Sequence, residues 1–364
     1  MARILYVAYP LLQVHDESAG GAEQILWTLE REMARSGVHT TVAASAGSRV
    51  SDELFPTGQP CTEPDDYERR RLEHEDRIIE FVRRRTRQGT PFDLIHDHSG
   101  SFCKRAAEID MPVLATLHLP RTFYPAGSFD DVPVNVSFNC VSESQAKSFS
   151  DLDALAAVVP NGIALDYFEA TGDLAQNSGR LGLLWLGRIC EEKAPHLALE
   201  IAERAAMPIT LAGQVYPFSY HQEYFAREVA PRLRSMPNAR FISAPSAELK
   251  RNLLRHAQAL LITSLAEETS SLVAMEAAAS GTPVVAFRTG AHAEVVREGV
   301  TGFLVEGPDE AGLALQNISS INSETCVQHA QKNFFAVKMA EKYSQLYKQL
   351  AHPEKLIRFA EETV

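Results

Sequence analysis

The chain has 364 residues, of which 45% are hydrophobic and 23% charged, and its formal net charge is −12. This length can bury two domain cores. The acidic balance argues against nucleic acid as a partner, since nucleic-acid binding usually needs a basic surface. It argues weakly against tight binding to anionic membranes. The apolar start is too short for a signal peptide and no run is long enough to span a membrane. We therefore expect a cytoplasmic protein.

The expected elements of the first half alternate between apolar runs and helical patterns, which predicts βαβ units and parallel sheets. A helix is expected over 22–36. The arginine-rich segment 68–87 is interleaved with acidic residues and has an apolar stripe that includes Leu72, so we interpret it as a solvated amphipathic helix. A membrane-docking helix is the alternative. The expected strands are 4–8, 40–44, 94–96, 113–117, 134–140 and 156–159.

A linker and a second series of strands follow. Val-Pro-Asn-Gly-Ile at 159–163 contains a turn signal, and the polar stretch that runs to Arg180 is typical of an interdomain linker. The chain ends in a helical pattern from about 334 to 350. We predict an α/β fold with domains at 1–165 and 166–338, followed by helices over 339–364. The second-half strands are 181–186, 209–212, 240–242, 259–262, 284–286 and 302–305.

The most informative stretch carries Glu268 and Glu276, eight positions apart, around the start of a small-residue helix. The helix follows the apolar strand 259–262 and leads into Gly-Thr-Pro-Val-Val-Ala at 281–286. In an open α/β sheet, ligands bind at the carboxyl ends of the strands. There a loop carboxylate can accept hydrogen bonds from sugar hydroxyls, and a second carboxylate on the helix can hold a ribose. The helix N-terminus between them offers N–H groups to a diphosphate.

Two cations follow the first strand of the second half. Arg188 and Lys193 stand in the sequence Gly-Arg-x4-Lys, in a loop before a helix. They can neutralise the charge that develops on a departing diphosphate, which is work that a metal ion would otherwise do. The alternative is a pair of solvated surface charges, with Lys193 near Glu191 and Glu192.

Glycines at three positions suggest close approach to a nucleotide. Gly20 and Gly21 open the helix expected over 22–36, and their lack of a Cβ lets backbone N–H groups reach a phosphate. A flexible loop at a helix start is the alternative, and the dinucleotide fingerprint Gly-x-Gly-x-x-Gly is absent. Gly213 ends the strand 209–212, where it would let a nucleotide approach.

Histidines end two of the expected first-half strands. His118 follows the strand 113–117, where a neutral imidazole can orient a sugar hydroxyl or an acceptor. His96, Asp97 and His98 close the strand 94–96. His96 and His98 share a face and could hold a metal, but no third ligand has a telling spacing, so we predict acceptor-side or supporting roles.

The cysteines are widely spread and odd in number, and no Cys-x-x-Cys occurs. This pattern predicts reduced, buried thiols and neither a disulfide framework nor a zinc site. The residues are Cys61, Cys103, Cys140, Cys190 and Cys326.

Taken together, the Glu-x7-Glu pair, the Gly-Arg-x4-Lys loop and the tandem glycines followed by Glu23 resemble the retaining glycosyltransferases of family 4. The resemblance implies the GT-B fold, in which two Rossmann-like domains with parallel sheets face a cleft and a C-terminal helix crosses back to the first domain. It implies glycosyl transfer with retention, from a nucleotide-diphosphate sugar to a hydroxyl acceptor, without a metal cofactor. The first domain would then bind the acceptor and the second the donor.

The resemblance also assigns roles to residues and shows two departures. It implies that Glu268 contacts the donor sugar and Glu276 the ribose, while His118 reaches the sugar or the transferring oxygen. Family members usually have glycine directly after Gly-Arg-x4-Lys, whereas this chain has Ala194. They also usually have Gly-Phe-Gly after the first glutamate, whereas this chain has Thr-Ser-Ser, which narrows the sugar pocket and adds hydroxyls. The donor-binding candidates at the helix start are Thr269, Ser270, Ser271, Leu272 and Val273.

The identities of the base, the sugar and the acceptor have no signature in the sequence, and the acceptor could be a small molecule, a saccharide or a natural product. A homodimer is compatible with the sequence. Two other classes stay open. One is a nucleotide-sugar epimerase or hydrolase on the same fold, and the other is a non-catalytic nucleotide-sugar-binding protein.

Overall fold

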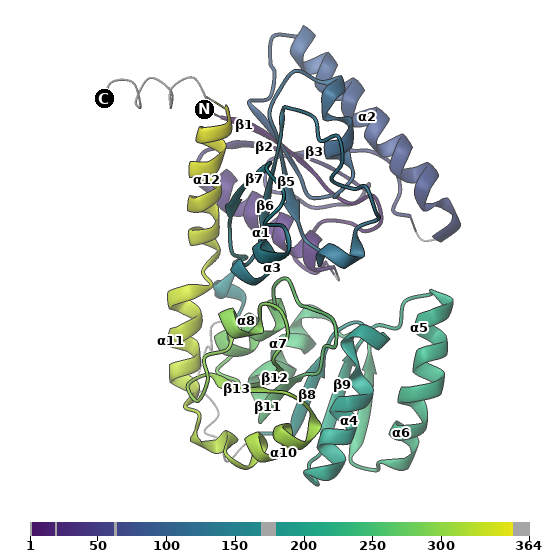
Figure 1. The fold of residues 1–364 in the computed structure, drawn as a ribbon, viewed down its shortest axis with the longest axis vertical. Helices are drawn as coiled ribbons and strands as arrows, with labels where there is room; N and C mark the ends of the chain where they lie inside the picture. Colours follow the sequence, from purple (N-terminus) through teal and green to yellow (C-terminus); the bar gives the residue numbers. More distant parts are fainter. Residues whose placement is uncertain (1, 19, 62–63, 169–179, 352–364) are drawn as a thin grey trace. The chain divides into compact units, whose positions relative to one another are not determined.

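The computed structural model of the chain describes residues 2–18, 20–61, 64–168 and 180–351 (Figure 1). The chain divides into two compact units, of which the first comprises Met1–Gly162 and Ala336–Val364 and the second Ile163–Phe335. These divisions fall three residues before the predicted boundaries at 165 and 338. Most of the predicted linker and the end of the predicted C-terminal helices, 169–179 and 352–364, lie outside the described residues.

The first unit is built on a parallel sheet of seven strands in the order β3-β2-β1-β4-β5-β6-β7. Strand β3 is the one that the sequence did not predict. It is short, lies at the sheet edge and ends in a proline, so it lacks the long apolar run of a central strand. The strands are β1 (Arg3–Val7), β2 (His39–Ala44), β3 (Glu53–Pro56), β4 (Leu94–Asp97), β5 (Val113–Leu117), β6 (Val136–Cys140) and β7 (Leu155–Val158).

The helices of the first unit are α1 (Gly21–Arg35), α2 (Tyr67–Arg87), α3 (Glu143–Ser148) and α12 (Ala336–Ala351). As predicted, the last helix belongs to the first unit: α12 packs on α1, and Tyr343 and Tyr347 are buried there. The single helical run predicted from 334 begins two residues later, because the backbone at Phe334 and Phe335 pairs with Ile163 instead.

Helix α2 is amphipathic, as predicted, and its arginines pair with acidic side chains. Arg69 lies 2.8 Å from Glu73, and Arg71 lies 2.7 Å from Glu75. The inclusion of Leu72 in the apolar stripe was wrong, since Leu72 is 45% exposed. Among the residues described, no helix combines the length and the apolar character needed to cross a membrane.

The second unit has a parallel sheet in the order β10-β9-β8-β11-β12-β13. Apolar side chains on both faces of this sheet form its two core clusters, one of them around the buried Trp185. The strands are β8 (Leu183–Leu186), β9 (Ile209–Gly213), β10 (Ala239–Ser243), β11 (Ala259–Ile262), β12 (Val284–Phe287) and β13 (Gly302–Val305). The helices are α4 (Pro195–Arg204), α5 (Ser219–Tyr224), α6 (Ala230–Ser235), α7 (Ala247–His256), α8 (Leu272–Ala279), α9 (His292–Val295), α10 (Pro308–Gln316) and α11 (Ser323–Asn333).

Both sheets reverse their strand order once, between β1 and β4 in the first unit and between β8 and β11 in the second. At such a switch point, the loops after the two strands run to opposite faces of the sheet and leave a crevice at its carboxyl edge. The loops that carry Gly20, His98, Lys193 and Glu268 follow these four strands, whereas His118 follows β5 and Gly213 ends β9. The topology therefore places the candidate residues of each unit at its ligand-binding edge.

Helix α4 is followed by an alanine, Ala206, in a backbone conformation that favours glycine. Ala206 is exposed and has a φ of 52°, in the left-handed region, and its N–H donates to the carbonyl of Glu203 at 3.1 Å. A Cβ in this region costs roughly 1–2 kcal/mol, which glycine avoids at an entropic cost of roughly 0.5–1 kcal/mol in the unfolded chain.

We expect Ala206→Gly to stabilise the second unit by about 0.5–1 kcal/mol, because this helix end favours glycine. The urea midpoint of unfolding should rise, while it should not rise in the neighbouring control Ala205→Gly, whose φ is −80°. An unchanged or lower midpoint for Ala206→Gly would contradict this interpretation.

Candidate active site

Two loops at the switch point of the second sheet bring Lys193 and Glu268 together. Lys193 follows β8 and Glu268 follows β11. The Lys193 ammonium forms an ion pair with Glu268 Oε1, and the Ser264 hydroxyl donates to the same oxygen at 2.5 Å. The two charged side chains are 27% and 14% exposed. Lys193 is therefore paired across the two loops and is not a solvated surface charge.

The carboxyl group of Glu268 is held in its ionised form. Burial by itself would raise its pKa, but the charges of Lys193 and His292 and the hydrogen bonds from Lys193 and Ser264 outweigh burial and lower the pKa below its usual value. At neutral pH Glu268 therefore accepts hydrogen bonds and donates none. This is the state that can bind sugar hydroxyls.

The loop that carries Lys193 is fastened to the strands beneath it. The indole N–H of Trp185 donates to the Thr263 hydroxyl at 3.1 Å, and that hydroxyl lies 3.1 Å from the carbonyl oxygen of Lys193. The next residue, Ala194, is buried with a φ of 46°. A left-handed conformation explains why glycine usually stands at this position in the family that the chain resembles.

A second loop supports Glu268 from the end of β12. Gly290 has a φ of +52°, and a Cβ there would lie 2.2 Å from the carbonyl oxygen of Glu268, so only glycine fits. Ala291 N–H donates to that carbonyl at 2.7 Å. His292 is buried, and its Nδ1 lies 2.7 Å from the carbonyl oxygen of Phe287. Gly290 and His292 were not among the predicted site residues, although a glycine between strand and helix was a usable signal.

Helix α8 presents an N-terminus beside this pair. Its N-cap residue, Ser271, is buried and its side chain makes no capping hydrogen bond. Among the described residues the buried Ser270 hydroxyl finds no hydrogen-bond partner either. Unsatisfied donors at a helix start suit an anion. Leu272 and Val273 form the first turn of the helix, as predicted.

Arg188 and Glu276 lie in the same unit, and each has a partner. The Arg188 guanidinium is 44% exposed and lies 3.6 Å from Glu192, so it can turn to a ligand at little cost. Glu276 is buried on α8 and forms a 2.7 Å ion pair with Lys250 of α7. A ribose at Glu276 would have to share this carboxylate with Lys250.

The structure gives a packing reason for glycine at positions 213 and 20, whereas from the sequence we explained these glycines by close approach of a nucleotide. A Cβ on Gly213 would lie 1.8 Å from the carbonyl oxygen of Gly187, so the space that glycine leaves is filled by backbone. A Cβ on Gly20 would lie 1.9 Å from Oε2 of Glu23. Gly20 caps α1 and Gly21 begins it, so the N–H groups at this helix start remain candidates for a phosphate.

The histidines of the first unit form one hydrogen-bonded cluster. His98 Nδ1 lies 2.9 Å from His118 Nε2, and His98 Nε2 lies 3.3 Å from His96 Nδ1. His96 is 0% exposed, and its ring nitrogens lie 2.6 Å from the Tyr347 hydroxyl and 2.7 Å from the Thr116 hydroxyl. Only His118 is partly exposed, so a role in contacting a ligand is compatible with His118 alone among the three.

This arrangement argues against direct acceptor contact by His96, Asp97 and His98, which are all buried. Asp97 accepts hydrogen bonds from the backbone N–H of Ser99 at 2.7 Å and of Cys103 at 2.8 Å. It therefore orders the turn after β4. The predicted supporting role fits these three residues, and the contribution of Tyr347 could not be foreseen from residues near them in the chain.

Burial keeps the His118 imidazole neutral by lowering its pKa to about 4, below the ordinary histidine value of about 6.5. The unfolded chain therefore binds more protons than the folded chain below pH 6.5. Stability from this group is complete above pH 6.5 and is lost as the pH falls towards 4. Between pH 7.5 and 5 the loss is about 2 kcal/mol.

We expect His118→Gln to flatten the fall of unfolding free energy between pH 7.5 and 5, whatever its effect on stability at pH 7.5. Urea unfolding at several pH values measures the slope, and His39→Gln, which changes an exposed histidine, is the matched control. Equal slopes for wild type and His118→Gln would refute the assignment of a neutral imidazole at His118.

Two doubly wound parallel α/β units, of which the first includes the C-terminal helix α12, define the GT-B class of architecture. Residues 180–322 match the family model described as glycosyl transferases group 1, and residues 19–167 match the model described as glycosyltransferase family 4. The chain belongs to this family of glycosyltransferases.

Named relatives agree with this assignment. The chain is 35% identical over 173 residues to the D-inositol 3-phosphate glycosyltransferase of Geodermatophilus obscurus, covering 43% of this chain and 38% of that one. It is 26% identical over 369 residues to D-inositol 3-phosphate glycosyltransferase 1 of Catenulispora acidiphila, covering 86% and 85%. The first three relatives are matched over 38%, 58% and 44% of their length, about half on average.

Among solved structures, HepE from Anabaena in complex with UDP and glucose is similar over 96% of this chain and 100% of that chain. The TM-score is 0.73 at 14% sequence identity. This likeness establishes the shared fold.

Proposed function

We propose that the chain is a retaining glycosyltransferase that moves a sugar from a nucleotide-diphosphate sugar to a hydroxyl acceptor. The observation that carries the proposal is the Lys193–Glu268 pair beside the open N-terminus of α8, at the switch point between β8 and β11. This edge offers a carboxylate for sugar hydroxyls and cationic and N–H donors for a diphosphate. An activated sugar needs both kinds of group.

In the proposed donor complex, Glu268 accepts hydrogen bonds from the sugar hydroxyls. Lys193 and Arg188 then shift from their carboxylate partners towards the diphosphate, which gains charge as the glycosidic bond breaks. N–H groups of α8 near Ser271 add to this stabilisation. Because these donors supply the positive charge, we propose that the diphosphate departs without a metal ion bound to it.

For the chemical step we propose front-face attack, which accounts for retention without a nucleophilic carboxylate. The acceptor oxygen bonds to the anomeric carbon while the bond from that carbon to the phosphate oxygen breaks. The acceptor proton passes to the leaving phosphate. The half-buried His118 is proposed to orient a sugar hydroxyl or the acceptor through its neutral imidazole.

An assay with a panel of nucleotide-sugars, each with and without acceptors, tests the proposal. The panel takes UDP-, GDP-, ADP- and dTDP-sugars as donors. Because the two relatives described above are both named D-inositol 3-phosphate glycosyltransferases, inositol phosphate is a sensible first acceptor. Release of nucleoside diphosphate that depends on an acceptor supports the transferase. Acceptor-independent turnover would favour an epimerase or hydrolase, and binding without turnover a non-catalytic binding protein.

A further inference from the structure

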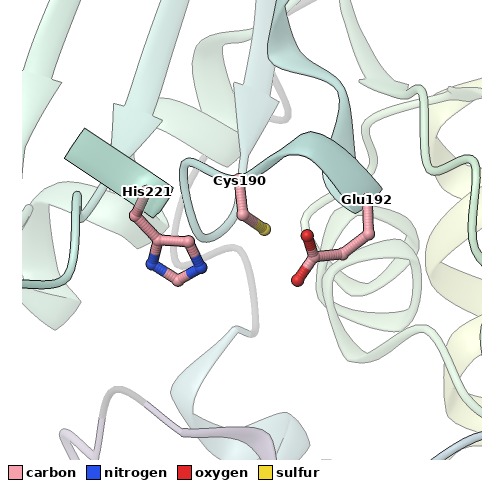
Figure 2. Close-up of side chains that lie close together, drawn as sticks. All are labelled: Cys190, Glu192 and His221. Carbon is pink, nitrogen blue, oxygen red and sulfur yellow. The ribbon is translucent and has the colours of Figure 1, made fainter. Parts of the chain in front are cut away.

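Three side chains with metal-ligating atoms lie close together in the second unit, near the loop that carries Arg188. Cys190 and Glu192 lie in the loop after β8, and His221 lies in the first turn of α5. The Cys190 sulfur, a Glu192 carboxylate oxygen and a His221 ring nitrogen all lie within 4.8 Å of one another. Figure 2 shows the three side chains extending into a common space, with one imidazole nitrogen towards the sulfur and the carboxylate.

His221 is the anomalous member of this group. The residue is 0% exposed, yet neither ring nitrogen has a hydrogen-bond partner among the residues that the structure describes. Leaving a buried polar atom unpaired costs roughly 1–3 kcal/mol, so native proteins rarely do so. The ring packs against Phe218 and Tyr220 at centroid distances of 5.5 and 4.2 Å, and such ring contacts are weaker than a hydrogen bond to an oxygen or nitrogen atom. A ligand bound to an imidazole nitrogen would give His221 the partner that it lacks in the described part of the chain.

The neighbouring groups define the chemistry of that partner. The thiol of Cys190 is buried and lies 3.5 Å from the carbonyl oxygen of Arg188, which is a weak contact. A sulfur, an imidazole nitrogen and a carboxylate oxygen are the ligand types of zinc. A thiolate and a carboxylate together balance its double charge, so the ion can lie near the Arg188 guanidinium.

We propose that Cys190, Glu192 and His221 bind one Zn²⁺ ion, with the fourth position open to water. Zinc bonds of about 2.0–2.3 Å in a tetrahedron bring ligand atoms to roughly 3.3–3.8 Å from one another. The three atoms thus need to close by about an ångström, which rotation of the flexible Glu192 side chain allows. The ion fastens the loop after β8 to the start of α5. The sequence by itself predicts no zinc site, because no Cys-x-x-Cys pair occurs in it. The three ligands proposed here have no such local spacing, since the first and the last lie 31 residues apart.

One consequence rests on the proposed function. A Glu192 carboxylate bound to zinc no longer pairs with Arg188, which is then free to meet a diphosphate. The zinc site itself does not depend on this consequence, and its test does not use glycosyl transfer.

The test uses the full chain, stripped of metal with a chelator and titrated with Zn²⁺ against a chromophoric competitor. We expect one tightly bound equivalent. Cys190→Ala and His221→Phe should each weaken binding by more than about 100-fold, since even outer residues of a zinc site contribute 10–100-fold. Cys326→Ala, a buried cysteine in the same unit, and His329→Phe are matched controls that should retain wild-type affinity.

Titration of the wild-type chain with Co²⁺ gives a readout that does not depend on how the variants fold. A thiolate ligand should produce a sulfur-to-cobalt charge-transfer band at one equivalent, and this band should disappear on addition of Zn²⁺. Absence of the band, or wild-type zinc affinity in a folded Cys190→Ala chain, would overturn the proposal.

Discussion

We expect Glu268→Gln to lower the kcat of glycosyl transfer by about 10²–10³-fold. Glutamine keeps the size of the side chain but removes the charge that Lys193 and Ser264 hold in place. It also replaces one accepting oxygen by a donor, so a sugar hydroxyl that donated to the carboxylate loses its partner. Steady-state kinetics with the donor and acceptor found in the panel assay measure the effect.

The control for this variant lies one position earlier. Glu267→Gln makes the same chemical change at an exposed neighbour and should keep wild-type kcat. Circular dichroism should show both variants folded, since the partly exposed Lys193 can be solvated when its partner is lost. Wild-type kcat in a folded Glu268→Gln chain would refute the assignment of Glu268.

Arg188→Ala should lower kcat and kcat/KM together, by about 100-fold. The reason is that this cation is proposed to meet charge that appears on the diphosphate only as the bond breaks. Removal of a cation that bound the ground state equally well would instead raise KM alone. The Arg188 side chain is 44% exposed and forms an ion pair with Glu192 at 3.6 Å, so its removal should spare the fold.

Arg227→Ala is the matched control for this variant. Arg227 is an exposed arginine of the same unit that pairs with Glu228 at 3.2 Å, and its loss should leave both kinetic constants unchanged. An Arg188→Ala chain that changes KM but keeps kcat would contradict a role for Arg188 in the departure of the diphosphate.

Much of the fold follows from local sequence pattern. The strands 113–117, 259–262 and 302–305 were predicted to the residue, because each is a short apolar run between clear turn or helix signals. The edge strand β3 escaped prediction because its burial is partial and its sequence carries a proline.

The sequence indicated the individual site residues, but it did not indicate which of them contact one another. Glu268 and Lys193 each follow a strand end, yet they are 75 positions apart, and only the strand order of the sheet makes them neighbours. The same holds for His96, whose partner Tyr347 comes from the far end of the chain. For Gly213 the structure adds a packing reason that the sequence did not show, since the carbonyl oxygen of Gly187 occupies the place of a Cβ, and close approach of a nucleotide there stays a prediction.

The most direct test of the account is a crystal structure of the chain with the nucleotide that gives the largest thermal shift among UDP, GDP, ADP and dTDP. We expect its diphosphate within about 3 Å of the N–H groups that begin α8. Lys193 and Arg188 should have turned to it from Glu268 and Glu192. A nucleotide bound elsewhere, with the Lys193–Glu268 pair unchanged, would contradict the account.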